Sequence, residues 1–289
     1  MSESSLYTIV SRPELSEPVL LIVMNGWIDA SSAAQAAADV IVSQSEPTRV
    51  ADFDDDQLLD HRARRPTLRI DDGVSKSLDW PAITLDHMVD NDGTDILLLG
   101  GPEPDYHWRS FTAAIDEIIA DFGVRMVVSF GAYPAAAPHT RPPALSSTAS
   151  SPELAHLPGF LNASLDVPAG IQTSIEMSAA VSGLPSIGLW AQVPHYLGGM
   201  PYPVASAALL DGLFDAAHIK FDSSELAKAG VTARQRIDEL LEQNPDHQSM
   251  LADLEKTFDD RVEAASLELP SGDDLAEQFE QFLRNQPET

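Results

Sequence analysis

The sequence predicts an α/β protein, a three-layer α/β/α sandwich built on a mainly parallel sheet. Short apolar runs rich in β-branched residues alternate along the chain with segments in which apolar residues recur at helical spacing. Hydrophobic residues make up 44% of the 289 residues, which is enough for a sizeable core. No repeat of solenoid period is present. Alternating strands and helices favour a parallel sheet with helices on both faces.

The first strand–loop–helix unit starts at the apolar run Val19–Met24. Residues 30–42 follow as an alanine-rich stretch at helical spacing, and Asp29 or Ser31 stands where a side chain can cap the first turn. Arg49–Phe53 then predicts a second strand. The chain is therefore expected to begin strand, loop, helix, strand.

Two extended runs, Thr67–Ile70 and Ser75–Leu78, predict a β-hairpin. The residues between them, Asp71-Asp72-Gly73, favour a tight turn because Asp-Gly tolerates the backbone angles that such turns need. Pro81–Val89 is expected to add a strand at the edge of the sheet.

The clearest unit lies in the middle of the chain, where the strand Ile96–Leu99 precedes a helix from Trp108 to Phe122. Gly123 follows at the position of a helix C-cap glycine. The stretch Met126–Arg141 begins as a buried strand and breaks at Gly131 into a proline-stiffened loop. The chain is expected to continue with an irregular segment at residues 142–168, a helix at Ile171–Val181, a strand at Ile187–Val193 and a helix at Val204–Phe214.

The composition changes at Ser223, so we expect a core domain at residues 1–220 and an acidic helical appendage at residues 221–289. The appendage carries 17 acidic and 6 basic side chains. The run Thr232-Ala233-Arg234-Gln235 fits a capping box. A helical stripe is formed by Leu251, Leu254, Phe258 and Val262, and it predicts a helix that packs on the body or on a neighbouring subunit.

Charge and composition exclude several classes of function. The 45 acidic and 17 basic residues give a net charge of −28, which would repel nucleic acid and anionic membrane surfaces. The chain has no cysteine, so disulfides and thiolate chemistry are excluded. No signal peptide or membrane-spanning run is apparent, so we expect a cytoplasmic protein without membrane insertion. Motifs for dinucleotides, phosphate loops, zincins and serine hydrolases are absent, and we predict no cofactor and no metal.

Candidate site residues lie in four loops that should leave the carboxyl ends of the strands, where ligands bind to such sheets. The candidates are Asp29, Glu103, His139, Arg141, His195 and Tyr196. Two histidines and two carboxylates can form a general acid–base pair or a metal site with a water ligand, if they face one another. The other interpretation is structural, with each histidine wedged between prolines or bonded to a backbone carbonyl.

Arg141 has two interpretations of its own. In a functional site it would clamp a carboxylate or a phosphate, whereas in a structural role it would be a buried partner for Glu103 or Asp29. A possible basic island is formed by Arg62, Arg64 and Arg65 in an otherwise acidic chain. It is either a surface counter-charge to the aspartates beside it, or it faces the crevice or an interface.

Several of these motifs, taken in order, resemble one family. They are Gly26-Trp27-Ile28-Asp29-Ala30, the run from Leu59 to Pro66, Gly101-Pro102-Glu103-Pro104-Asp105 with Trp108, Pro138-His139-Thr140-Arg141-Pro142, and Val193-Pro194-His195-Tyr196 with Tyr202-Pro203. Together they resemble the bacterial branch of the proteasome assembly chaperone 2 family. The resemblance extends from about Val19 to Phe214.

The resemblance implies an α/β/α sandwich related to phosphorylase- and hydrolase-like folds, and self-association, with a trimer favoured. Eukaryotic members of the family assist proteasome assembly without enzymatic chemistry. The first hypothesis is therefore a non-enzymatic assembly or scaffolding protein with an unidentified protein partner. The alternative is a small-molecule binder or a hydrolase- or phosphorylase-like enzyme, with His139 or His195 as general base, Glu103 or Asp29 orienting it, and Arg141 as anion clamp.

Overall fold

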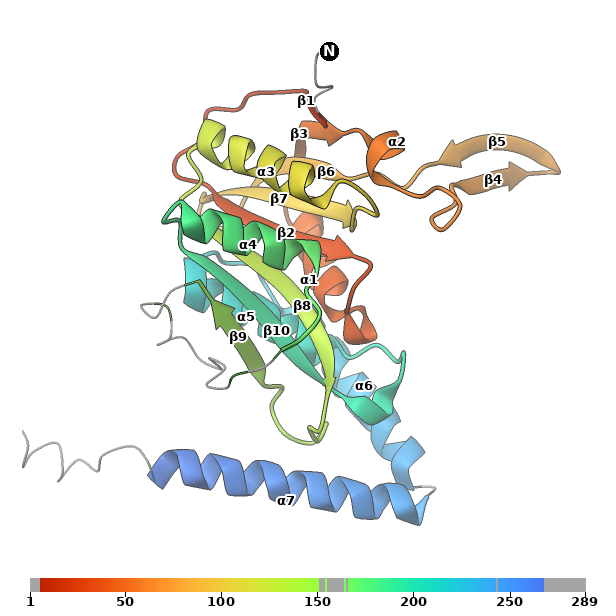
Figure 1. Cartoon of the computed structure of the whole chain (residues 1–289). Helices are drawn as coiled ribbons and strands as arrows, with labels where there is room; N and C mark the ends of the chain where they lie inside the picture. Colours follow the sequence, from red (N-terminus) through yellow and green to blue (C-terminus); the bar gives the residue numbers. More distant parts are fainter. Residues whose placement is uncertain (1–5, 151–153, 155–163, 165, 243, 268–289) are drawn as a thin grey trace, which may run out of the picture.

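The computed structural model describes residues 6–150, 154, 164, 166–242 and 244–267, and it has three layers (Figure 1). An eight-stranded sheet in the order β1-β3-β6-β7-β2-β8-β10-β9 forms the middle layer. Helices α3 (Trp108–Phe122) and α4 (Ile171–Val181) cover one face, and α1 (Ala33–Ser43) and α5 (Pro203–Ala217) cover the other. The predicted α/β/α sandwich is confirmed.

The centre of the sheet is parallel and its edges are antiparallel. The four parallel strands are β7 (Asp95–Pro102), β2 (Val19–Asn25), β8 (Met126–Ala135) and β10 (Ser186–Pro194). Antiparallel pairing extends the sheet through β6 (Thr84–Val89), β3 (Thr48–Phe53) and β1 (Tyr7–Ile9) on one side, and through β9 (Leu145–Ala149) on the other. The sheet is therefore mixed around a parallel core.

Strand β2 shows why a continuous apolar run is needed at the centre of this sheet. Val19, Leu21 and Val23 enter the hydrophobic cluster beneath α1 and α5. Leu20 and Ile22 point the other way, into the cluster beneath α3 and α4. Since successive side chains of a strand point to opposite faces, a strand covered on both sides must be apolar at every position.

Three elements differ from the sequence expectations. The predicted edge strand at Pro81–Val89 is instead the interior strand β6, which lies between β3 and β7. The segment at residues 142–168, expected to be irregular, contains the edge strand β9. The proposed capping box at Thr232–Gln235 is wrong, because it lies inside α6 (Ser224–Glu242). The Asp222 carboxylate accepts the Ser224 N–H at 2.9 Å and so marks the start of that helix.

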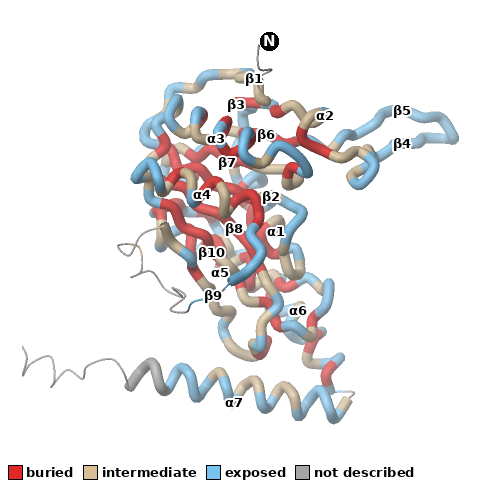
Figure 2. The backbone as a smooth tube through the Cα atoms, viewed as in Figure 1, coloured by how far each residue is buried: buried red, intermediate tan, exposed pale blue. Residues whose placement is uncertain are grey.

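The predicted β-hairpin is present as a separate two-stranded sheet, β4 (Thr67–Asp71) and β5 (Val74–Asp79), after the short helix α2 (Asp55–Leu58). Its turn has Asp72 at φ 47° and Gly73 at φ 75°, as a tight turn with two left-handed residues requires. Figure 1 shows this hairpin extending away from the three layers, and in Figure 2 it is exposed along its whole length.

Two helices follow the three layers. Helix α6 packs on α5 and contributes Ile237 and Leu241 to the core. Helix α7 (Pro245–Leu267) crosses the end of the body in Figure 1, and none of its described side chains is buried. Of the predicted stripe, Leu251 is half-buried, whereas Val262 is 52% exposed. The domain division at residue 220 stays a prediction, and residues 268–289 lie outside the described part. Within that part, no helix is long and apolar enough to cross a bilayer.

Candidate functional site

The six candidate residues lie in two groups rather than around one set of mutual contacts. In the first group, Asp29 and Glu103 each accept a hydrogen bond at the start of a helix. The Asp29 carboxylate accepts the backbone N–H groups of Ala34 at 2.8 Å and Gln35 at 3.1 Å, so it caps α1. Burial raises the pKa of Asp29, and these N–H donors offset part of the increase. The structure thus gives Asp29 the capping role that the sequence suggested.

Glu103 connects the ends of three elements. Its carboxylate accepts the Ile171 N–H at the start of α4 at 2.6 Å, and its own N–H donates to the Asn25 carbonyl at the end of β2, also at 2.6 Å. An anionic side chain is favourable at a helix N-terminus because that end carries a partial positive charge. Glu103 therefore fixes where α4 begins relative to β2 and β7.

The basic island begins beside this first group. The Arg64 guanidinium forms an ion pair with Asp105, whereas Arg62 and Arg65 are exposed. Burial alone would raise the pKa of Asp105, but the Asp60 N–H and Arg64 outweigh it and hold that pKa below its usual value. Arg64 thus has an acidic partner within the body, and the other two arginines are exposed in the segment that precedes the hairpin.

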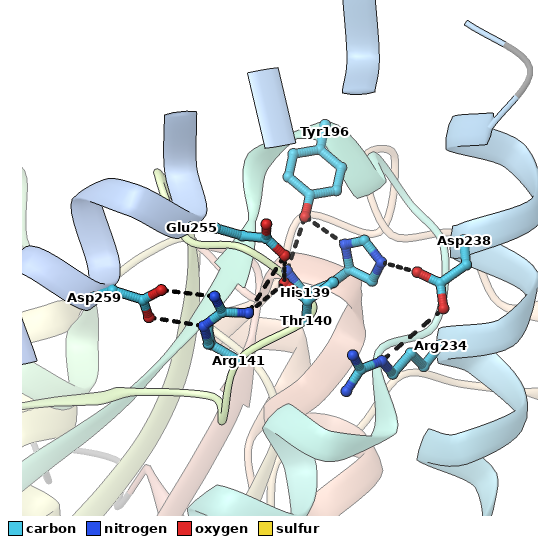
Figure 3. Close-up of polar contacts among 8 residues, drawn as sticks. All are labelled: His139, Thr140, Arg141, Tyr196, Arg234, Asp238, Glu255 and Asp259. Carbon is cyan, nitrogen blue, oxygen red and sulfur yellow. Dashed lines mark hydrogen bonds and ion pairs between the residues drawn. The ribbon is translucent and has the colours of Figure 1, made fainter. Parts of the chain in front are cut away.

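The second group is a polar cluster that joins two loops of the body to the C-terminal helices, and we call it the C-terminal clasp (Figure 3). His139 is at its centre, with a side chain that is 0% exposed. Its Nδ1 lies 2.7 Å from the Tyr196 hydroxyl, and its Nε2 lies 2.8 Å from Oδ1 of Asp238 on α6. The members of the clasp are His139, Thr140, Arg141, Tyr196, Asp238, Glu255 and Asp259.

A neutral His139 with its proton on Nε2 satisfies both of its partners, because the Asp238 carboxylate can only accept. The Tyr196 oxygen accepts the backbone N–H of His139 at 2.8 Å, so its own proton is free to donate to Nδ1. Nε2–H then donates to Asp238. Burial raises the pKa of Tyr196 to about 12, although the His139 N–H offsets part of the rise, so the phenol keeps the proton that it donates.

Arg141 holds α7 through a bidentate ion pair with Asp259. Its Nε lies 2.8 Å from Oδ1 of Asp259 and its Nη2 lies 2.7 Å from Oδ2, while Nη1 lies 3.3 Å from Glu255. The neighbouring Thr140 hydroxyl donates to the same Glu255 carboxylate. These bonds raise the pKa of Arg141 and lower that of Asp259. The partners considered from the sequence, Glu103 and Asp29, are therefore not the ones that Arg141 contacts.

His195 lies beside the clasp. Its Nδ1 is 3.1 Å from the Ala135 carbonyl, and its ring meets the Tyr196 ring edge-on at a centroid distance of 5.5 Å. The residue itself is exposed. A ring N–H that donates to a backbone carbonyl is a structural contact, and here it connects the end of β10 to the end of β8.

The sequence analysis did not predict one buried polar pair, Glu176 and Ser129. Glu176 on α4 accepts a hydrogen bond from the Ser129 hydroxyl of β8, in the layer between helix and sheet. Burial raises the pKa of Glu176 to about 7, although the Ser129 hydrogen bond offsets part of the effect. Helical spacing does place Glu176 one position after the buried Ile175, but nothing in the sequence pairs it with Ser129, 47 positions away.

The sequence analysis also did not predict the acidic residues of the clasp. Asp238, Glu255 and Asp259 lie 99 to 118 positions beyond their partners. The available signal was the i, i+4 spacing of Glu255 and Asp259, which places two carboxylates on one face of a helix. Among the described residues, no group of three or more His, Asp or Glu side chains could hold a metal ion.

Comparison with solved structures finds the same fold over most of the chain. A Corynebacterium glutamicum protein of unknown function is 27% identical, with a TM-score of 0.85 over 90% of this chain and 99% of its own. A Mycobacterium tuberculosis proteasome-assembly chaperone homologue is 30% identical, with a TM-score of 0.75 over 82% and 99%. A PAC2 family protein from Streptomyces avermitilis is 31% identical, with a TM-score of 0.73 over the same shares.

No curated protein matches the sequence. The PAC2 family model matches residues 23–241, which span the strands from β2 to β10 and reach the end of α6. The match includes both groups of candidate residues and the Asp238 side of the clasp. This chain belongs to the PAC2 family.

Proposed function

We propose that this chain is a non-enzymatic assembly or scaffolding protein of the cytoplasm, similar in role to proteasome-assembly chaperones. The observation that carries the proposal is the C-terminal clasp. His139, one of the two candidate bases, and Arg141, the candidate anion clamp, use their hydrogen bonds to hold α6 and α7 on the body. A general base must reach a substrate proton, and both ring nitrogens of His139 already have partners.

The same contacts give α7 a fixed position with one face free. Glu255 and Asp259 bond to Thr140 and Arg141 of the body, and Asp253, Lys256 and Asp260 are exposed. A long helix held by charged contacts, with no buried side chain among those described, contributes little to the core. It is well suited to contact another protein, and its acidic face fits a partner with a basic surface.

The family relationship supplies the kind of partner. The relative from Mycobacterium tuberculosis is described as a proteasome-assembly chaperone homologue. We therefore expect this chain to bind subunits of a large oligomeric complex, the proteasome first among them, and to do so as a homo-oligomer, with a trimer favoured. The absence of cofactor and metal motifs in the sequence agrees with this role.

The test is reconstitution from purified components. Proteasome α- and β-subunits from the same organism are mixed with and without this chain, and assembly intermediates are followed by native gel and mass photometry. We expect a complex that contains the chain and a faster appearance of half-proteasomes. The charge reversals Asp253→Lys and Asp260→Lys should weaken that complex, and the matched control Glu46→Lys, an exposed carboxylate on the turn after α1, should not.

A different result would favour the small-molecule alternative. In that case the chain would leave assembly unchanged, and a metabolite would raise its thermal midpoint. A ligand at a hundred times its dissociation constant stabilises the native state by about 2.7 kcal/mol. Loss of that shift in a folded His195→Ala variant would place the ligand at the exposed histidine beside the clasp and overturn the scaffold proposal.

A further inference from the structure

The sheet face beneath α3 and α4 changes from apolar to polar at β8. Strands β2 and β7 present leucines and isoleucine to the core cluster on this face. The next three strands, β8, β10 and β9, present polar residues and glycines instead, since alternate residues of a strand share a face. We call this surface the polar sheet face. Its members are Ser129, Gly131, Tyr133, Ser146, Thr148, Gly188, Trp190 and Gln192.

Trp190 lies flat on the polar sheet face. A Cβ added at Gly131, its partner on β8, would overlap Cε3 and Cζ3 of the indole. A Cβ added at Gly188, two positions earlier on β10, would lie 3.0 Å from Nε1. Because both ends of the indole come this close to the backbone, its ring is parallel to the sheet and its other face points away. The two glycines make room for a flat aromatic platform.

Polar groups stand at the Nε1 end of this platform. Oγ1 of Thr148 and Oε1 of Glu176 would lie 2.9 Å and 3.3 Å from the same added Cβ at Gly188. Glu176 reaches this point from α4, where its carboxyl group bonds to Ser129. Among the described residues, neither Nε1 of Trp190 nor the Thr148 hydroxyl has a hydrogen-bond partner. Donors and acceptors for a ligand are therefore available at this edge.

The next row of the polar sheet face is ordered by its own hydrogen bonds. The Tyr133 hydroxyl lies 2.8 Å from Oγ of Ser146, and Nε2 of Gln192 donates to the same oxygen at 3.0 Å. These three residues and Trp190 are half-buried, and Thr148 is exposed. In Figure 1, no helix of the described residues lies in front of β9. The platform can thus be reached from the β9 edge of the sheet.

We propose that the polar sheet face binds an uncharged planar heterocycle, with the chemistry of a nucleobase, stacked on Trp190. Aromatic side chains stack on flat rings of this kind, and every nucleobase offers such a face. Glu176 and the Thr148 hydroxyl stand beside the indole, where they can bond to ring N–H and carbonyl groups. A planar ring covers the flat indole and carries its polar groups in one plane, unlike a small cation or a puckered sugar.

Charge favours a ligand without phosphate or carboxylate groups. The polar sheet face contains no lysine or arginine, and the whole chain has a net charge of −28. An anionic ligand would therefore meet repulsion and no cationic partner on this face. No residue of the face except its neighbours in sequence belongs to the clasp region, so the inference goes beyond the assembly role and does not depend on it.

The test is binding of adenine, hypoxanthine and uracil to the purified chain, followed by isothermal titration calorimetry and by quenching of tryptophan fluorescence. We expect at least one base to bind with one site per chain and to quench the fluorescence. Trp190→Leu should weaken that binding about tenfold or more, because the stacking contact is lost. The matched control is Trp80→Leu, at a tryptophan that is 54% exposed, and it should bind as the parent does.

A second variant keeps the test decisive if loss of the half-buried indole disturbs the fold. Thr148→Val preserves the shape and the strand preference of an exposed residue on the edge strand β9. It should weaken binding about fivefold, because one hydrogen bond to the ligand is lost. Thr67→Val, at an exposed position in the hairpin, is its control. Circular dichroism checks that each variant is folded.

Three results would overturn the inference. The first is no binding of any base at millimolar concentration. The second is binding that is unchanged in folded Trp190→Leu, or in Thr148→Val where Trp190→Leu does not fold, because the ligand would then lie elsewhere. The third is binding of methyl glucoside or tetramethylammonium in place of the bases, which would show that a planar ring is not what the platform selects. None of these results bears on the assembly test, which uses α7.

Discussion

Replacing Glu176 with Gln should stabilise the protein, most strongly at alkaline pH. Glu176 is 9% exposed, and its carboxylate accepts a hydrogen bond from Ser129 beneath α4. Burial raises its pKa from 4.5 to about 7, so the folded state holds a proton that the unfolded chain releases at lower pH. The stability that this proton provides is complete below pH 4.5 and is lost as the pH rises through about 7.

The magnitude follows from the size of the pKa difference. Each pKa unit corresponds to about 1.4 kcal/mol, so ionised Glu176 should cost about 3 kcal/mol at pH 8 and almost nothing at pH 4. Glutamine has the same shape, accepts the Ser129 hydrogen bond and carries no charge. In a domain of this size, 3 kcal/mol corresponds to a rise of about 6 °C in Tm.

The assay is chemical denaturation of parent and Glu176→Gln at a series of pH values from 4 to 8. The difference between the two should grow across this range. Glu239→Gln, at an exposed position on α6, is the control, and its effect should stay within about 0.5 kcal/mol. A Glu176→Gln effect that is the same at pH 5 and pH 8 would refute the reasoning, because it would show that Glu176 does not change its ionisation on folding.

Three further predictions concern the contacts of the clasp and the close backbone packing at Gly101. Arg141→Ala should release α7, which would appear as faster amide exchange in that helix with no change in β2, and high salt should have the same effect on the parent; unchanged exchange would contradict the role of the clasp. His139→Ala should lower the free energy of unfolding by about 2 kcal/mol, because Asp238 and the Tyr196 hydroxyl lose a partner, and urea unfolding measures the change; an unchanged free energy would show that water replaces the ring. Gly101→Ala should lower stability by about 3 kcal/mol or more, because Gly101 has φ +112° and its added Cβ would lie 2.2 Å from the Ala82 carbonyl oxygen; a soluble variant with the parental Tm would show that the backbone adjusts.

Long apolar runs allowed most of the sheet to be predicted. The run Val19–Met24 is apolar at every position, and that pattern occurs only where a strand is covered on both faces. The edge strands carry no such signal. Strand β9, Leu145–Ala149, contains two serines and a threonine, and it forms because β10 offers it a free edge. The position of β6 inside the sheet likewise depends on its pairing with β3 and β7, which local sequence does not encode.

The candidate site shows the same division between local and long-range information. Proline-framed loops identified His139 and Arg141 as residues held in defined positions. Their partners depend on how α6 and α7 return to the body after about a hundred residues, and no local pattern specifies that path. Asp29 is the opposite case, because its capping contacts lie only five and six residues away and could be expected from the sequence.

The clasp also sets an order of events during synthesis. Arg141 and the strands around it leave the ribosome well before Asp259, which follows Pro194, the last residue of the parallel core, by about 65 residues. At a synthesis rate of about 5–20 residues per second, the parallel strands are complete for several seconds before α7 exists to close over their ends. During that interval the guanidinium of Arg141 and the end of β8 face the solvent without their helical cover. The clasp therefore stays open while the nascent chain extends from β10 to α7, and it can close only after Asp259 has been synthesised.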